Sequence, residues 1–326
     1  MNSMLRSGRH HDEVVYKSNI ITGEWKSMHK VYSGLENLPE GRASDHITEG
    51  CLVLEGGAFR GLYTQGFLDA MMENDINMAC VIGVSAGALS GMNYISGQIG
   101  RSGRINLEFR HDSRYVGARA VLHSHSLLDI GFLTEDRGIL EPFDRERFEN
   151  SKQRFIAVAT NCDNGKAVCF EKGRSRDIFA GVRASATMPY ISPMVWIDGV
   201  PYLDGGCTCK IPYHWALQNG FQKIIVLRTR ETTYRKPDKI SQTALRFYRS
   251  REAFAKKLAI SNKSYNRQCD EIEQLHMEGR LLRIAPSETV TVARVEGDME
   301  KLGNLYWLGY RDGVENDALI RNYLGI

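Results

Sequence analysis

Two short apolar runs on either side of one helix-length stretch constrain the fold of this chain more than any other feature. Residues 51–54 (CLVL) and 79–84 (ACVIGV) have the length and composition of buried strands, and the stretch from 62 to about 74 favours a helix. A strand, a helix and a second strand joined this closely form a βαβ unit, which requires a parallel sheet and a right-handed crossover. The sequence therefore predicts an α/β fold with a mainly parallel central sheet flanked by helices.

Later segments extend this sheet. Two hairpins and one central strand are expected, at 154–160 with 167–170, 194–197 with 200–203, and 221–227. A helix should follow Ser85 and reach about Ile99, and residues 101–150 are expected to form a polar insertion over the sheet. We therefore predict one α/β domain over 50–326, preceded by a polar, partly ordered lead-in over 1–49.

Composition argues against several classes of protein. In 326 residues, 42 Lys and Arg against 39 Asp and Glu give a formal net charge of +3, too small on its own to indicate nucleic-acid binding. Seven cysteines cannot all pair within one chain, and residues 1–18 lack the apolar region of a signal peptide. The uncharged stretch 78–100 contains five glycines, which favours a strand, a turn and a helix over a membrane span. We expect a cytoplasmic protein.

Residues 83–87 (GVSAG) form a GxSxG motif at the end of the second predicted strand. Flanking glycines permit the sharp strand-to-helix turn that lifts a serine hydroxyl clear of the sheet. An ordinary βα turn is the alternative, because only three positions of the motif are fixed. Its place between a buried strand and a helix favours the catalytic interpretation, with Ser85 as the nucleophile.

A second glycine-rich turn, 55–61 (EGGAFRG), follows the first strand. Its backbone N–H groups can converge on an anion at a helix N-terminus. A dinucleotide would require an acidic residue at the end of the next strand, and a nucleoside triphosphate would require Lys followed by Ser or Thr; neither feature is present there. Because both loops lie at one edge of a parallel sheet, an oxyanion beside Ser85 fits best.

These motifs, in this order, resemble the patatin-like phospholipase family. In ordinary α/β-hydrolases the oxyanion loop lies well upstream of the nucleophile, whereas Gly57 precedes Ser85 by only 28 residues. Two later segments complete the order of the family's motifs: 183–189 (RASATMP) and 204–206 (DGG). The resemblance covers about 50–230, and the tail resembles that of bacterial members at 285–286 (AP) and 298–310 (DMEKLGNLYWLGY).

The resemblance implies a three-layer patatin-like fold and a Ser–Asp dyad, in which Ser85 is the nucleophile and Asp204 accepts its proton directly. It also implies an oxyanion hole made of backbone N–H groups, those of Gly56, Gly57 and Ala58. Supporting motif positions are Arg60, Gly61, Gly83, Gly87 and Gly205. Two positions depart from the family pattern: Ala58 stands where a third consecutive glycine is usual, and Glu55 replaces a leading Asp.

Other residues compete for these roles. Asp198 is also followed by Gly, but its position between two short strands favours a hairpin turn. His214 and His276 follow Asp204 in the order of an ordinary triad, although their surroundings favour structural or solvated roles. The cysteines nearest Asp204 in the sequence lack the spacing of a zinc site; they are Cys162, Cys169, Cys207 and Cys209.

A basic helical segment is expected at about 239–280. Its first part, from Lys239 to Arg267, carries eight basic residues and one acid, a local net charge of +7, with aromatic and aliphatic residues interleaved. A basic amphipathic helix of this kind suits an anionic membrane surface. A helix packed on the sheet with a solvated basic face explains the pattern equally well, so both interpretations stay open.

The sequence thus predicts a serine lipid acyl hydrolase that cleaves carboxylic esters of phospholipids or other acyl lipids. We expect no cofactor, no metal ion and no nucleic-acid partner, and peripheral contact with an anionic membrane if the basic segment docks there. Two alternatives remain: an ordinary Ser-His-Asp esterase, and a non-catalytic α/β protein that binds an anion or a nucleotide.

Overall fold

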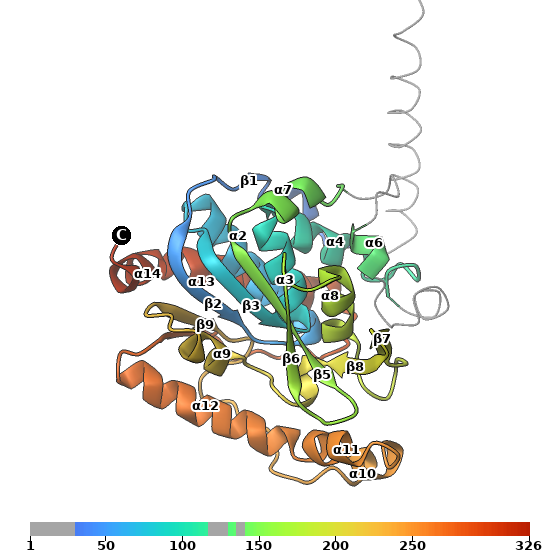
Figure 1. Cartoon of the computed structure of the whole chain (residues 1–326). Helices are drawn as coiled ribbons and strands as arrows, with labels where there is room; N and C mark the ends of the chain where they lie inside the picture. The colour runs from blue at the N-terminus through green and yellow to red at the C-terminus, as the bar shows by residue number, and fades with distance from the viewer. Residues whose placement is uncertain (1–29, 117–129, 135–140) are drawn as a thin grey trace, which may run out of the picture.

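The computed structural model describes residues 30–116, 130–134 and 141–326 (Figure 1). Its main sheet has eight strands, in the order β10-β9-β2-β3-β5-β8-β7, with β6 paired to β5. Strands β10, β9, β2, β3 and β5 run parallel, whereas β6, β8 and β7 join antiparallel. The predicted α/β class with a mainly parallel sheet flanked by helices is confirmed.

The bounds of the elements are as follows. The strands are β1 (Gly41–Arg42), β2 (Thr48–Leu54), β3 (Met78–Val84), β4 (Gln98–Ile99), β5 (Arg154–Asn161), β6 (Ala167–Glu171), β7 (Val195–Ile197), β8 (Val200–Asp204), β9 (Ile224–Leu227) and β10 (Leu282–Ile284). The helices are α2 (Gly61–Glu73), α3 (Ala86–Ile95), α4 (Arg101–Phe109), α6 (Ile130–Thr134), α7 (Arg145–Asn150), α8 (Ile178–Ala186), α9 (Tyr213–Gln218), α10 (Gln242–Phe247), α11 (Glu252–Ala259), α12 (Ser261–Met277), α13 (Met299–Glu315) and α14 (Asp317–Leu324). Short 3₁₀ helices are η1 (Leu35–Asn37), η2 (Ala58–Arg60) and η3 (Gly205–Cys207).

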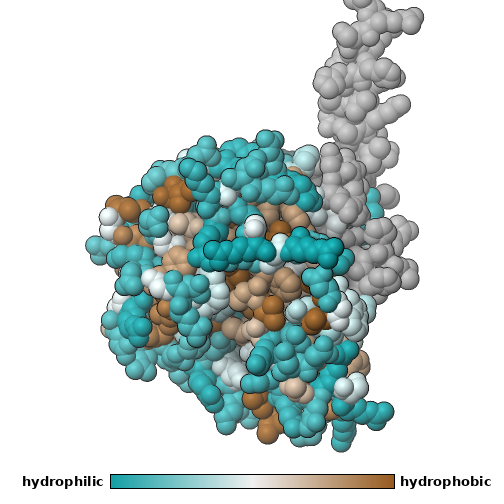
Figure 2. Space-filling model, in the orientation of Figure 1, coloured by the Kyte–Doolittle hydropathy of each residue, from teal (hydrophilic) through white to brown (hydrophobic). Residues whose placement is uncertain are grey.

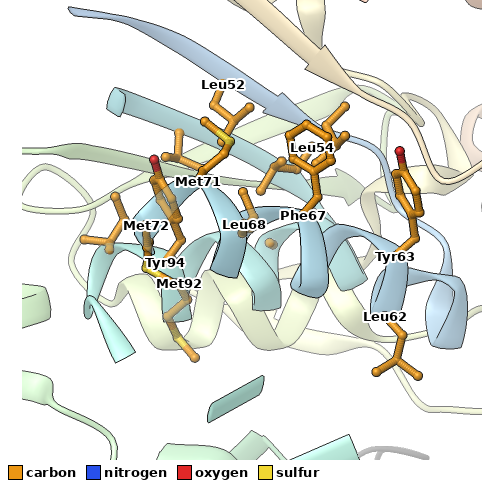
Figure 3. Packing of buried hydrophobic residues seen from close by; sticks show 14 of the residues in the cluster. Leu52, Leu54, Leu62, Tyr63, Phe67, Leu68, Met71, Met72, Met92 and Tyr94 are labelled. Carbon is orange, nitrogen blue, oxygen red and sulfur yellow. The ribbon is translucent and has the colours of Figure 1, made fainter. Parts of the chain in front are cut away.

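Alternating side chains of β2 divide the core into two layers. Leu52 and Leu54 belong to the large cluster that contains α2, α3 and α13, and Figure 3 shows them against Phe67 and Met71 of α2. The intervening side chains of β2 face a second cluster, which α9 and α12 cover from the other side. Successive side chains of a strand point to opposite faces, so helices on both faces bury the central strands completely.

Helix α13 packs directly on α2 through glycines. A Cβ added to Gly66 would lie 2.0 Å from the Tyr306 carbonyl oxygen, and one added to Gly309 would lie 1.9 Å from the Tyr63 carbonyl oxygen. The Tyr306 hydroxyl donates a hydrogen bond to the buried Asp69 of α2 at 2.6 Å. Helix α13 is therefore an integral part of the core.

Both predicted hairpins form, and the turn at Asp198 and Gly199 joins β7 to β8 as expected. The helix after Ser85 is shorter than predicted, because it ends at Ile95 and a two-residue strand, β4, follows. Gly97 and Gly100 interrupt the helical path with φ values of 67° and 74°, a conformation that favours glycine.

The expected polar insertion at 101–150 contains a helix with a buried apolar side. Ile105, Leu107 and Phe109 of α4 are buried, so the prediction of a polar insertion is wrong for this helix. The remaining described part of the range includes α6 and α7. Residues 117–129 and 135–140 of this prediction lie outside the described residues.

Packed structure also begins before Gly50. Tyr32, Leu35 and Leu38 are buried in the large core cluster, so this part of the expected lead-in belongs to the fold; residues 1–29 lie outside the described residues. The uncharged stretch 78–100 forms β3, the Ser85 turn, α3 and β4. No helix in the described part of the chain is long and apolar enough to cross a membrane.

The basic segment is helical but divided. Three helices, α10, α11 and α12, replace the single amphipathic helix inferred from Lys239 to Arg267. The Ser241 side chain accepts the N–H of Ala244 and caps α10, and an irregular turn from Tyr248 to Arg251 separates α10 from α11. The basic residues therefore do not lie on one continuous helix face.

Candidate active site

Ser85 occupies the turn between β3 and α3. Its backbone has φ 56° and ψ −123°, a strained conformation for a residue with a side chain. A Cβ on Gly83 would lie 2.4 Å from the Gly87 carbonyl oxygen, and one on Gly87 would lie 2.6 Å from the Leu54 carbonyl oxygen. Both glycines are therefore required for this sharp turn, which places the serine hydroxyl beyond the end of the strand.

A second serine supports the strained turn. The Ser85 N–H donates to Oγ of Ser185 at 2.8 Å, and the Ser185 hydroxyl donates to the Val158 carbonyl oxygen at 2.7 Å. Ser185 is fully buried in α8, within the stretch 183–189. The sequence did not predict this role for Ser185; the one local feature that could have indicated it is a small hydroxyl residue in a run of small residues.

Asp204 lies at the end of β8 and faces Ser85. Its Oδ2 accepts the Ser85 hydroxyl at 2.6 Å, and its Oδ1 accepts the Gly206 N–H at 2.6 Å. A Cβ on Gly205 would lie 2.1 Å from the Val158 carbonyl oxygen, so only glycine fits after Asp204. The structure thus brings together the two side chains that the sequence assigned to the dyad, whose catalytic roles remain a prediction.

Backbone contacts hold Asp204 in place. Its N–H donates to the Thr187 carbonyl oxygen at 2.8 Å, and the Thr160 hydroxyl donates to the Asp204 carbonyl oxygen at 2.9 Å. Asp198, the rival aspartate, lies at the exposed tip of the β7–β8 hairpin, where it pairs with Arg176 at 3.1 Å. The two aspartates of the hairpin therefore have separate environments, one buried and one solvated.

Burial raises the pKa of Asp204 above the ordinary carboxyl value. The hydrogen bonds from Ser85 and Gly206 and the positive charges of Lys210 and Arg294 act in the opposite direction without cancelling the effect of burial. Burial also lowers the pKa of Lys210, whose Nζ donates to the Gly206 carbonyl oxygen at 2.6 Å. A carboxylate with a raised pKa is a stronger base than a solvated one.

The glycine-rich loop lies beside Ser85. A Cβ on Gly56 would lie 2.9 Å from the Val84 carbonyl oxygen and 3.1 Å from Cβ of Ser85, so this close approach requires glycine. The Gly56 N–H donates to the Lys210 carbonyl oxygen at 3.4 Å, whereas the N–H groups of Gly57 and Ala58 have no acceptor among the described residues. Of the three predicted donors, two are therefore unoccupied.

Ala58 adopts a left-handed backbone with φ 49°. This conformation costs a residue with a Cβ more than it costs glycine. It explains why a glycine is usual at this position in the resembled family and shows that the loop keeps its shape without one. Gly61, three residues later, has no room for a side chain, because a Cβ would lie 2.8 Å from Cβ of Ala86.

Glu55 forms a buried polar contact behind the loop. Its Oε2 accepts the Thr229 N–H at 2.8 Å and lies 3.9 Å from Nε of Arg228. Arg228 is fully buried and also donates to the Tyr265 hydroxyl at 3.2 Å. Glu55 thus joins the glycine-rich loop to the end of β9, a contact that the sequence did not predict. Arg60 is buried, and its Nε has no hydrogen-bond partner among the described residues.

An open cavity of about 870 Å³, counting the part that is open to solvent, extends from Ser85 between η2, α2, α3 and α4. Apolar side chains dominate its lining near the serine, with Phe59, Leu89 and Met188 among them. A mainly apolar cavity with a few polar groups is typical of a small-molecule site. The arrangement can therefore hold an apolar group against the Ser85 hydroxyl.

Neither candidate histidine contacts the pair. His214 stacks on Tyr213, and its Nε2 lies 3.3 Å from Oε1 of Glu271. His276 in α12 has its ring nitrogen 3.4 Å from the Leu281 carbonyl oxygen. The structure thus places both histidines with other partners.

Comparison with known proteins adds independent findings. A family model described as patatin-like phospholipase matches residues 52–217, and one described as a domain of unknown function (DUF6363) matches residues 252–325. The chain is similar to the uncharacterized protein YjjU of Escherichia coli, with 27% identity over 183 residues that cover 55% of this chain and 51% of YjjU. It is also similar to the uncharacterized NTE family protein Rv1063c of Mycobacterium tuberculosis, with 28% identity over 169 residues that cover 49% of this chain and 43% of that protein.

The chain spans about half the length of the curated relatives it matches. Among solved structures it is similar to VipD from Legionella pneumophila, with a TM-score of 0.45 and 14% sequence identity over 90% of this chain and 71% of VipD.

Proposed function

The chain belongs to the patatin-like phospholipase family, and from this premise we propose that it is a serine lipid acyl hydrolase that uses Ser85 and Asp204. The observation that carries the proposal is the contact of 2.6 Å between the Ser85 hydroxyl and Asp204, at a strained turn beside an apolar cavity. The substrates would be carboxylic esters of phospholipids or other acyl lipids.

The reaction follows from the positions of these groups. Ser85 Oγ attacks the ester carbonyl carbon while its proton passes to Oδ2 of Asp204. The N–H groups of Gly57 and Ala58 hold the oxyanion, and Gly56 supports it less because its N–H contacts the Lys210 carbonyl oxygen. The departing alkoxide takes the proton from Asp204. Water then attacks the acyl carbon of the acyl-enzyme while Asp204 accepts a proton from that water. The bond between the acyl carbon and Ser85 Oγ breaks, Oγ takes the proton from Asp204, and the carboxylic acid leaves.

Covalent labelling tests this proposal directly. A fluorophosphonate should attach to Ser85 of the full chain, and a panel of phospholipids and glycerides should give free fatty acid. The Ser85→Ala variant should do neither. A folded wild-type chain that is not labelled and cleaves no ester would instead support the non-catalytic alternative.

We also propose that the protein contacts anionic membranes at its surface, through an exposed apolar patch near the cavity. We define the aromatic patch as Tyr190, Ile191, Trp196 and Phe247. The last three are 51%, 59% and 60% exposed, and the ring centroids of Tyr190 and Phe247 lie 5.3 Å apart. Met188, two residues before Tyr190 in the sequence, lines the cavity.

Basic residues lie close to the aromatic patch. Arg251 lies over the Trp196 ring at 5.7 Å, and Arg246 and Arg249 are exposed beside Phe247 in the sequence. Figure 1 shows α10 and α11 at the lower right of the molecule, with β7 and β8 above them on the same side. Figure 2 shows apolar and polar residues interleaved along the lower edge of the molecule. Exposed aromatic residues with basic neighbours suit the boundary of an anionic bilayer.

A further inference from the structure

The cavity beside Ser85 changes in chemical character along its length. Ser85, Leu89 and Asn93 follow one another along α3 and all line it. Eight residues at 1.5 Å per residue place Asn93 about 12 Å from Ser85 along the helix. The lining near Ser85 is mainly apolar, although Arg294, whose charge acts on Asp204, also lines the cavity. The far part is lined by Asn93 and by Arg101 of α4, whose Nη1 lies 3.4 Å from Oδ1 of Asn93.

Arg101 is a buried cation whose hydrogen-bond acceptors are all neutral. It is 3% exposed, and it donates to the carbonyl oxygens of Glu141 at 3.0 Å and Leu133 at 2.6 Å besides Asn93. Within the described residues no carboxylate lies within 4.0 Å of its guanidinium. The nearby Glu141 carboxylate binds Arg104 instead, at 2.7 Å.

A guanidinium has five N–H groups, and the described residues accept three of those of Arg101. Burial lowers its pKa to about 10, so it is still charged at neutral pH. The charge of the Glu141 carboxylate offsets part of the cost of burying Arg101 without a contact within 4.0 Å, and an anion in direct contact with the guanidinium would offset more. The cavity therefore ends at a positive charge that has N–H groups free, within the described residues, to donate further hydrogen bonds.

We propose that this far end recognises an acyl group that carries a carboxylate at the end remote from the ester. The inference rests on the proposed function, because it requires the acyl chain to extend from Ser85 into the cavity. A guanidinium binds a carboxylate through paired N–H donors, which a plain methyl end cannot use. An extended chain advances about 1.2 Å per bond, so about ten bonds would connect the ester carbon to the carboxylate over about 12 Å.

Two p-nitrophenyl esters of equal chain length test the proposal: the decanoate and the monoester of sebacic acid, the ten-carbon dicarboxylic acid. Wild-type kcat/KM should be at least about tenfold higher for the sebacate monoester, since a site built for a hydrogen-bonding group discriminates strongly against an analogue without it. Arg101→Gln should abolish or reverse this preference. A wild-type preference for decanoate would overturn the proposal.

Arg104→Gln is the matched control. Arg104 is on the same helix and binds the same Glu141, but it does not line the cavity, so the variant should keep the preference for sebacate. If Arg104→Gln loses the preference as fully as Arg101→Gln, Arg101 acts only by tying down the segment around Glu141 and the proposal is wrong.

A binding measurement keeps the test independent of turnover and of how well the variant folds. Free decanoate should raise the Tm of the wild-type chain more than 1-decanol, a neutral molecule of the same length, does, and Arg101→Gln should lose this difference. If the wild type cleaves no ester and Ser85 is not labelled, the proposed function fails, and the two Tm shifts still decide whether the cavity recognises a carboxylate. Equal shifts would contradict this inference alone.

Discussion

The Ser85 hydroxyl lies 2.6 Å from Oδ2 of Asp204, with no histidine between them, although the two residues are 119 positions apart in the chain. The first prediction follows from this contact. Ser85→Ala and Asp204→Asn should each lower kcat/KM for a soluble ester by at least about 10³-fold, because the nucleophile or its base is lost. Initial rates and fluorophosphonate labelling measure the effect.

The matched controls are Asp198→Asn, His214→Ala and His276→Ala. Asp198 also precedes a glycine but lies on the exposed hairpin tip, and both histidines have other partners. All three variants should stay within about threefold of wild type, since surface changes away from a site usually have small effects. Loss of activity in His276→Ala with retained activity in Asp204→Asn would favour the ordinary triad.

The second prediction concerns pH. Asp204 must be ionised to act as the base, and burial raises its pKa, so kcat/KM should fall on acidification at a higher pH than the ordinary carboxyl value of about 3.9 would give. Lys210 lowers the pKa of Asp204 through its positive charge. Lys210→Met should therefore move the acid limb of the kcat/KM profile to higher pH.

The midpoint of the limb, rather than its height, is the quantity to compare. Lys210 also binds the Gly206 carbonyl oxygen, so its loss can lower turnover for structural reasons without moving the midpoint. Lys239→Met, at an exposed position, is the control and should leave the midpoint unchanged. The same midpoint in wild type and Lys210→Met would show that the charge of Lys210 does not lower the pKa of Asp204.

Local sequence features predicted the strand-turn-helix geometry at Ser85. The turn itself requires glycine at positions 83 and 87, because a side chain at either Gly83 or Gly87 would clash with backbone atoms. The order of β2, α2 and β3 was also predictable from local sequence, because each element has its own pattern of apolar residues. Asp204 was assigned only through the family resemblance, because a DG pair alone indicates a turn.

The hydrogen bonds that support the site join segments far apart in the sequence, and no local sequence pattern predicts them. Glu55 meets the Thr229 N–H across 174 residues, and the Ser85 N–H meets Ser185 across 100. Arg101 lay in a stretch predicted to be polar covering, yet the fold buries it at the end of the cavity. Burial of a charged side chain depends on what packs around it, which composition and periodicity do not encode.

The third prediction tests membrane contact. Trp196→Ala combined with Phe247→Ala should weaken sedimentation with anionic vesicles, because two large exposed rings of the aromatic patch are lost. In a second variant, Gln replaces the basic residues Arg246, Arg249, Lys256 and Lys257. This variant should bind anionic vesicles more weakly than wild type at low salt and about equally at high salt. Cleavage of a short soluble ester should be unchanged in both variants.

Leu319→Ala is the control for apolar loss. Leu319 is 48% exposed on α14, which Figure 1 shows on the other side of the molecule from α10. This variant should bind vesicles as wild type does. Unchanged sedimentation in the two test variants would favour a packed helical segment with a solvated basic face.

The fourth prediction tests how closely α13 is packed on α2. Gly309→Ala should lower the free energy of unfolding by at least about 3 kcal/mol, because its Cβ would lie 1.9 Å from the Tyr63 carbonyl oxygen and two helix backbones must move apart. Gly297→Ala is the control, since its Cβ would lie 3.6 Å from the nearest side chain, that of His111. Denaturant unfolding of both variants should give different midpoints, and equal midpoints would show that the helices are not held this closely.

The fifth prediction concerns stability and pH at Asp69. This carboxyl group is buried on α2, where it accepts the Tyr306 hydroxyl at 2.6 Å and the Gly100 N–H at 2.9 Å. Burial raises its pKa to about 7, while these hydrogen bonds and the charge of Arg104 act in the opposite direction. The unfolded value is about 3.9, so the folded state binds the proton more tightly than the unfolded state does.

A raised folded pKa contributes stability that is fully present below about pH 4 and is lost as the pH rises through about 7. The free energy of unfolding of wild type minus that of Asp69→Asn should therefore fall by up to about 4 kcal/mol between pH 4 and pH 8. A pKa difference of about three between the folded and unfolded states corresponds to that amount. Taking the difference between the two proteins cancels the contribution of Asp204, which titrates in both. Asp238→Asn, at an exposed position, should show no such change. A constant difference between wild type and Asp69→Asn across this range would mean that Asp69 is ionised in the folded protein at acidic pH, with its two hydrogen bonds outweighing the effect of burial.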